Sequence, residues 1–222
     1  MVGTNNRKPE WMFYPGWVVL SAISIPLAWI IVWVFISQIE KVVGGMIQVG
    51  GQTHVTEDFL FLYIFPPVLG LLTGSLQYLL LRRYLPRMEW WIAATILGWL
   101  LFSLVLGLLS VFAFFPTTVS PALAGVFLGG LIGLFQWWVL RQRVRLAALW
   151  ILGSALGWGA AWLLTDGAIS SKQEVLSVVL LPPAVGSIAW WLLLDKLPQR
   201  KSNGGNTPRS GLQKPSVPLG AD

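Results

Sequence analysis

Cysteine is absent from this 222-residue chain, and histidine occurs only once. The lack of cysteine excludes disulfides, thiolate metal ligands and thiol nucleophiles. Charged residues are also scarce, at 11 % of the chain, whereas a soluble domain carries about a quarter. No ionisable residue falls in the central part of a predicted span, so the chain lacks the acids and bases of a membrane enzyme or a proton-coupled pump. We therefore predict no enzymatic activity, no catalytic residue and no metal site.

Apolar sequence makes up 55 % of the chain. A spanning helix needs about 20 consecutive, mostly apolar residues. The chain is therefore predicted to be an all-α, polytopic membrane protein of six transmembrane helices, with its transmembrane domain over 17–198. The predicted spans are 17–38, 59–81, 90–112, 121–140, 149–165 and 175–194. Outside them lie an N-terminus over 1–16 and a tail over 199–222, predicted to be disordered because it has too few apolar residues to bury a core.

Prolines and glycines interrupt this pattern. Pro26 falls in the middle of the first span, where it removes a backbone donor and should kink the helix. Proline doublets at Pro66-Pro67 and Pro182-Pro183 interrupt the second and sixth spans. The connection 40–58 is rich in glycine and is predicted to be a flexible loop, with a re-entrant segment as the alternative.

Basic residues are distributed unevenly between the two sides of the predicted helix array. Thirteen of the 15 Lys and Arg lie in the N-terminus, the turns after the second and fourth spans, and the segment that follows the sixth span. Basic residues flanking spans concentrate on the cytoplasmic side. We therefore expect both termini to be cytoplasmic. A nucleic-acid partner is not expected, because no soluble basic face is available to bind phosphates.

An internal repeat organises the chain. The segment 70–99 recurs at 129–158, a shift of 59 residues without a gap, and each copy reads as two helices joined by a basic turn. The sixth span partly repeats the second, since GSIAWWLLLDKLPQ from Gly186 resembles GSLQYLLLRRYLPR from Gly74, with Ala189 at the place of glutamine. In the first span, Leu27-Ala28-Trp29 echoes the Leu-Gly-Trp of the repeat. These matches predict three tandem helical hairpins, of which the outer two are degenerate.

Small residues recur on one face of the second and fourth spans. Gly70 and Gly74, and their counterparts Gly129 and Gly133, are spaced four apart, which permits close backbone contact between membrane helices. We favour a packing seam over a ligand surface. The complementary strips are expected on the third and fifth spans, at Trp91, Ala94 and Gly98, and at Trp150, Gly153 and Gly157.

Two glutamines lie on the same glycine-bearing face. Gln77 and Gln136 each precede an arginine by five residues, so at about 1.5 Å per residue they lie roughly 7 Å inside the basic boundary. A buried amide needs a partner. Either the two amides bond to neighbouring helices, which we favour, or they line a polar site near the repeat axis.

The chain is rich in tryptophan, with 14 residues. Those near the basic turns, including Trp17, Trp91, Trp150 and Trp190, are predicted to be interfacial anchors. Trp29, Trp99 and Trp158 lie deeper, one in each predicted hairpin. There they either fill the core or contact a lipid, quinone or pigment, the ligands that remain open for a chain with no predicted cofactor.

The motif G-x-x-x-G-x-x-Q-aromatic ending in L-R, followed by W-x-x-A/G-x-x-L-G-W, resembles a group of uncharacterised multi-pass bacterial membrane proteins, many from photosynthetic lineages. The resemblance covers about 70–158 and departs at Ala189 and in the first span. It implies six helices in tandem hairpins within a bacterial plasma or internal photosynthetic membrane. It implies nothing established about function.

Two functional hypotheses follow. The first is a non-enzymatic membrane protein that associates with a membrane-protein partner, a second copy of itself or a lipophilic ligand. The absence of charge within the spans and the abundance of tryptophan favour it. The second is a small facilitator or transporter with a polar path between hairpins, which the proline doublets favour because broken helices often line binding sites.

Overall fold

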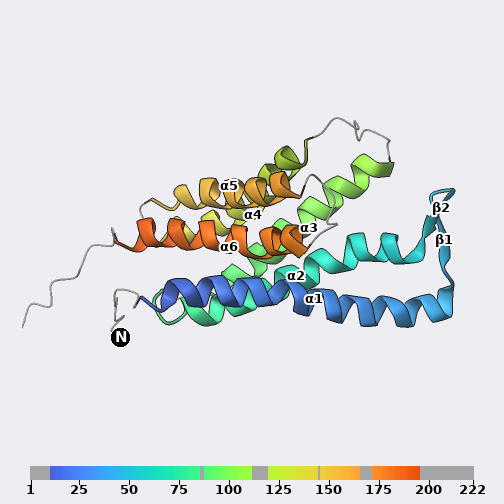
Figure 1. The fold of residues 1–222 in the computed structure, drawn as a ribbon, viewed down its shortest axis with the longest axis horizontal. Helices are drawn as coiled ribbons and strands as arrows, with labels where there is room; N and C mark the ends of the chain where they lie inside the picture. The colour runs from blue at the N-terminus through green and yellow to red at the C-terminus, as the bar shows by residue number, and fades with distance from the viewer. Residues whose placement is uncertain (1–10, 86–87, 112–119, 145, 166–171, 196–222) are drawn as a thin grey trace, which may run out of the picture.

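The computed structural model describes residues 11–85, 88–111, 120–144, 146–165 and 172–195. The described part is helical, apart from one short β-hairpin (Figure 1). Its elements are α1 (Phe13–Val43), β1 (Met46–Val49), β2 (Gln52–Val55), α2 (Thr56–Leu81), α3 (Trp90–Val111), α4 (Pro121–Leu140), α5 (Leu149–Leu164) and α6 (Lys172–Asp195). The predicted disordered tail over 199–222 lies outside the described residues.

The all-α class is confirmed, and five of the six helices are long and apolar enough to cross a membrane. The exception is α5, an apolar helix of 16 residues. A helix of that length extends about 24 Å, at about 1.5 Å per residue, which is less than the roughly 30 Å of a bilayer core. The chain therefore has the helices of an integral membrane protein, with α5 shorter than the others.

The first two helices are longer than predicted, and the connection between them is ordered. Helix α1 covers 31 residues and continues through Pro26. Instead of a flexible loop, β1 and β2 pair antiparallel in a hairpin. Gly50 and Gly51 form its turn with φ of 61° and 82°, the positive values that a two-residue turn of this hand requires. Thr56 ties the hairpin to α1 by donating its hydroxyl hydrogen to the Gly44 carbonyl at 2.7 Å.

The helices form a closed ring. In the described part, each helix packs extensively against the next one in the chain, and α6 also packs against α1. The beginning of α1 and the end of α6 lie at the same end of the molecule (Figure 1). The ring encloses two buried apolar clusters, one near the basic turns and one near the middle of the helices.

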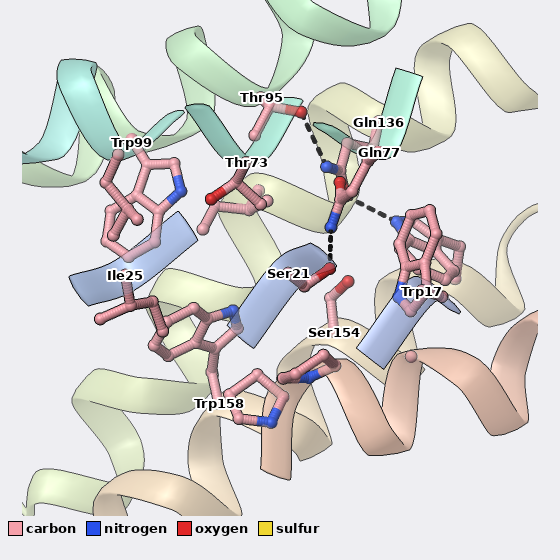
Figure 2. A pocket seen from close by; sticks show the side chains of 16 residues that line it. Trp17, Ser21, Ile25, Thr73, Gln77, Thr95, Trp99, Gln136, Ser154 and Trp158 are labelled. Carbon is pink, nitrogen blue, oxygen red and sulfur yellow. Dashed lines mark hydrogen bonds between the residues drawn. The ribbon is translucent and has the colours of Figure 1, made fainter. Parts of the chain in front are cut away.

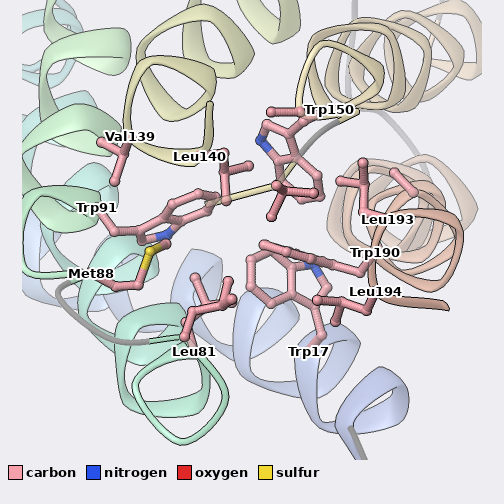
Figure 3. Close-up of a cluster of buried hydrophobic side chains, with 14 of the residues drawn as sticks. Trp17, Leu81, Met88, Trp91, Val139, Leu140, Trp150, Trp190, Leu193 and Leu194 are labelled. Carbon is pink, nitrogen blue, oxygen red and sulfur yellow. The ribbon is translucent and has the colours of Figure 1, made fainter. Parts of the chain in front are cut away.

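The cluster near the basic turns contains four tryptophans that the sequence analysis places wrongly at the membrane interface. Trp17, Trp91, Trp150 and Trp190 are at most 3 % exposed and point into the ring (Figure 3). We call this group the indole cluster. Their ring centroids lie 5.0–6.1 Å apart. Trp91 and Trp190 each have an adjacent tryptophan in the sequence, and that neighbour points outward. Trp90 is 66 % exposed and Trp191 is 55 % exposed. Successive helical side chains point about 100° apart, so only one of each pair can face the core.

The glycine face packs closely, but against different strips from those expected. A Cβ added to Gly70 would lie 2.9 Å from the Ile96 Cα, and one added to Gly133 would lie 2.9 Å from the Ile151 Cα. Gly74 faces Ile92, and Gly129 faces the backbone of Ser154. Gly98 and Gly153, by contrast, face the next helix around the ring, at Ile132 of α4 and Ala189 of α6. Helices α3, α4 and α5 thus each make close contacts with both of their neighbours in the ring.

Candidate functional site

Gln77 joins three helices inside the ring. Its amide nitrogen donates to the Ser21 hydroxyl of α1 at 2.9 Å, and its carbonyl oxygen accepts from Trp91 Nε1 of α3 at 3.0 Å. The side chain is 7 % exposed. Both halves of the amide are therefore satisfied by the helices on either side of α2.

Gln136 makes the same kind of bonds from α4. Its amide nitrogen donates to the Thr95 hydroxyl of α3 at 2.9 Å, and its carbonyl oxygen accepts from Trp150 Nε1 of α5 at 2.7 Å. The side chain is 3 % exposed. Interhelical bonds of this kind contribute about 0.6–2 kcal/mol in a membrane. The two expectations for the glutamines are thus compatible, since the same amides that bond to neighbouring helices also border a polar space.

The partners of the glutamines show a signal that the sequence analysis missed. A tryptophan followed four residues later by Ser or Thr occurs at Trp17-Ser21, Trp91-Thr95 and Trp150-Ser154. Residues four apart share a helix face. This pattern aligns α1 with α3 at a shift of 74 residues.

The Leu-Ala-Trp echo instead implied a shift of 70 residues and paired Trp29 with Trp99. Trp29 in fact lies on the outside of α1, 48 % exposed and stacked on Trp33 at 5.2 Å. The structure does bring Trp99 and Trp158 together, edge to face at 5.2 Å. The corresponding place on α1 is taken by Ile25.

A cavity of about 60 Å³ lies at the centre of the ring, beside both glutamines (Figure 2). All six helices contribute to its wall. The lining residues are Trp17, Ser21, Ile25, Leu69, Thr73, Gln77, Thr95, Trp99, Ile132, Gln136, Trp150, Ser154, Trp158, Pro182, Pro183 and Gly186. The four predicted glycines are not among them, because they lie at the helix contacts.

The lining is mixed, with six Ser, Thr and Gln side chains among mostly apolar ones, and it carries no ionisable group. Hydroxyls, amides and indole N–H groups alternate with apolar side chains, and the doublet Pro182-Pro183 forms part of the wall. One buried water needs about 10–15 Å³ of such space. A volume of about 60 Å³ therefore accommodates a few waters or one small organic molecule.

The indole cluster closes the cavity toward the basic turns, because Trp17 and Trp150 belong to both. Within the cluster, only Trp91 and Trp150 are held by the glutamines. Trp190 Nε1 is buried without a hydrogen-bond partner among the described residues. The other two indoles of the cluster, Trp17 and Trp190, are thus held by packing and not by a glutamine.

Nothing in the described ranges points to a metal, since no group of three or more His, Cys, Asp or Glu side chains comes together there. The chain matches no protein-family model, no curated protein and no solved structure. Function is therefore argued from the cavity itself.

Proposed function

We propose that the protein is a non-enzymatic integral membrane protein that binds a small, neutral, polar molecule in its central cavity and facilitates its passage across the membrane. The observation that carries this proposal is an uncharged cavity, walled by all six helices, in which hydroxyl and amide groups stand among apolar side chains. In a bilayer, such groups face one another across a protein interior because lipid cannot satisfy them.

The size of the cavity supports this proposal over a lipophilic ligand held at the same place. Pockets for drug-sized molecules measure about 300–1,000 Å³, whereas this cavity measures about 60 Å³. A quinone or pigment is too large for it. The lack of ionisable lining groups favours a neutral solute, because a desolvated ion needs compensating charge or many ligands.

Passage requires the indole cluster to move. The indole N–H of Trp190 has no hydrogen-bond partner within the described part of the chain, and Trp17 packs in the same cluster. Displacement of the Trp190 side chain therefore breaks only packing contacts. The prolines of α6 line the cavity next to them and leave the helix with missing backbone bonds. We propose that α6 and the beginning of α1 form the gate.

The repeat is also part of the proposal. The equivalent bonds of Gln77 and Gln136 support a threefold arrangement in which the repeating pairs are α2–α3, α4–α5 and, through the closed ring, α6–α1.

The uneven distribution of Lys and Arg supports placing the N-terminus and the tail in the cytoplasm. Since the chain has no native cysteine, cysteines introduced at Thr118 and Ser202 test the orientation. Labelling of Ser202→Cys but not Thr118→Cys by an impermeant reagent on intact cells would reverse it.

Solute flux into proteoliposomes tests the function. Wild-type protein should accelerate urea or glycerol entry over protein-free liposomes, and Gln136→Leu should change that rate. Gln142→Leu is the matched control, because Gln142 lies exposed in the turn after α4. Flux at background for every small neutral solute contradicts the proposal.

A second candidate is association with a partner through the outer surface. Its support is a groove of about 370 Å³ lined by the stacked pair Trp29 and Trp33 together with Glu57, Asp58, Phe61 and Leu62. Exposed aromatic rings beside acidic groups suit a basic or lipid-like partner. Retention of a stoichiometric partner in mild detergent, lost in Trp33→Ala, would favour this candidate.

A further inference from the structure

We propose that the part of the cavity where α6 meets α1 and α5 binds a carboxamide or urea group between Trp17 Nε1 and the Ser154 hydroxyl. This inference rests on the proposed function, because it names the class of solute. The bound group would take the place that the side chains of Gln77 and Gln136 occupy in the other two thirds of the ring.

The register of the ring identifies this place. Gln77 bridges Ser21 of the preceding helix and Trp91 of the following one, and Gln136 bridges Thr95 and Trp150 in the same way. For α6, the preceding helix offers Ser154 and the following helix around the ring offers Trp17. The residue at the glutamine position is Ala189. Its methyl group has no donor or acceptor and cannot form a hydrogen bond to either side chain.

Two close contacts place both groups near that position. A Cβ added to Gly153, the neighbour of Ser154, would lie 2.8 Å from the Ala189 Cβ. A Cβ added to Gly186, one turn before Ala189, would lie 3.2 Å from Trp17 Nε1. In Figure 2, Trp17 and Ser154 project toward the same part of the cavity.

Neither group bonds to another side chain in the part of the chain that the structure describes. Trp17 is 1 % exposed, and the described residues offer its N–H no hydrogen bond. The Ser154 hydroxyl is likewise unbonded within the described part. Both residues line the cavity, so a molecule bound there can supply the hydrogen-bond partner that each group lacks.

The geometry of the two occupied thirds defines the ligand chemistry. Each indole N–H there meets a carbonyl oxygen, and each hydroxyl meets the N–H of the same amide. A small molecule that reproduces both bonds needs a carbonyl oxygen and an adjacent N–H donor, as acetamide and urea have. Both are neutral, as the lining is, and both have only four heavy atoms.

Indole ¹⁵N–¹H spectra of the detergent-solubilised full chain test the site directly. Titration with acetamide should shift the Trp17 resonance in a saturable way, with Trp91 and Trp150 unchanged. Trp17→Phe assigns the signal. Ser154→Ala should weaken the response about two- to tenfold, the effect of one hydrogen bond. No saturable shift at Trp17 would overturn the proposal.

Ala189→Gln supplies the missing amide within the chain. It should move the Trp17 indole proton downfield toward Trp91 and Trp150 and abolish the acetamide response. Ala189→Met, similar in size but without an amide, should not move it downfield. Identical Trp17 shifts in the two variants contradict the inference. If Ala189→Gln does not fold, the Ser154→Ala titration decides.

The flux assay separates this inference from the proposed function. Saturable binding at Trp17 without solute flux would retain the subsite and reject the facilitator. Flux without a response at Trp17 would retain the facilitator and reject the subsite.

Discussion

Two thirds of the helix ring differ from the remaining third in how their polar groups are satisfied. Around α2 and α4, a glutamine bonds the helices on both sides. Around α6, Ala189 leaves Trp17 and Ser154 without a bridge, and Pro182-Pro183 line the cavity beside them. The same ring thus has a part that is cross-linked by its own side chains and a part that we propose is open to a ligand.

The difference teaches that degeneracy in a repeat can mark a site. On our proposal, the units that carry a glutamine hold the ring together, whereas the unit that carries Ala189 leaves space and two hydrogen-bonding groups for a ligand. If this comparison is right, substitutions in the cross-linked thirds should mainly change stability, and those around α6 should mainly change solute binding.

The largest expected effect concerns the α4–α5 contact. A Cβ on Gly129 would overlap the Ser154 backbone, so Gly129→Ala should lower the free energy of unfolding by about 3 kcal/mol, the upper end for overpacking. Gly130 is the matched control, because a Cβ there meets nothing within 4 Å. Gly130→Ala should be neutral or slightly stabilising. Equal melting temperatures for the two variants would remove the tight contact from the account.

Gln136→Leu should cost about 2 kcal/mol, because it leaves Trp150 Nε1 buried without an acceptor. Gln77→Leu should behave similarly through Trp91. Thermal unfolding in detergent measures both. A parent-like transition in either variant would show that the amide bridges do not hold the ring.

Replacing an indole in each region sharpens the comparison. Trp150→Phe breaks the bond to Gln136, whereas Trp17→Phe breaks no bond in the described part. Both lose similar volume, so Trp150→Phe should be more destabilising by about 1 kcal/mol, the net value of one hydrogen bond. The reverse order would contradict the assignment of Trp17 as the unpaired indole.

The smallest expected effect is a gain in stability. Ala189→Gln should raise the free energy of unfolding by about 1 kcal/mol, because it gives the third pair the bridge of the other two. Ala189→Met is the control for added volume. A gain of equal size with methionine would attribute the effect to packing.

Much of the fold was predictable, because apolar runs of spanning length are bounded by polar turns. The fourth span coincides with α4, and the second, third, fifth and sixth differ from their helices by at most three residues at either end. The β-hairpin was missed because its composition, rich in glycine and valine, is equally compatible with a loop. Its turn depends on the positive φ values of Gly50 and Gly51, which sequence spacing does not reveal.

The site was predictable in part. The repeat identifies Gln77 and Gln136 as equivalent residues, but it does not reveal their partners on α1, α3 and α5. The inward direction of Trp91 and the outward direction of Trp90 depend on helix rotation, which packing decides. The packing of α6 against α1, which closes the ring, was also missed. Spacing of Trp and Ser/Thr by four residues was the available signal for it.

The rate of urea entry into proteoliposomes, compared with glucose, tests the central claim most directly. The cavity of about 60 Å³ predicts accelerated urea entry over protein-free liposomes, no acceleration of the larger glucose, and an altered urea rate in Gln136→Leu but not in Gln142→Leu. Urea entry at the protein-free rate, or equal acceleration of both solutes, would contradict the claim that this cavity binds and passes a small polar molecule.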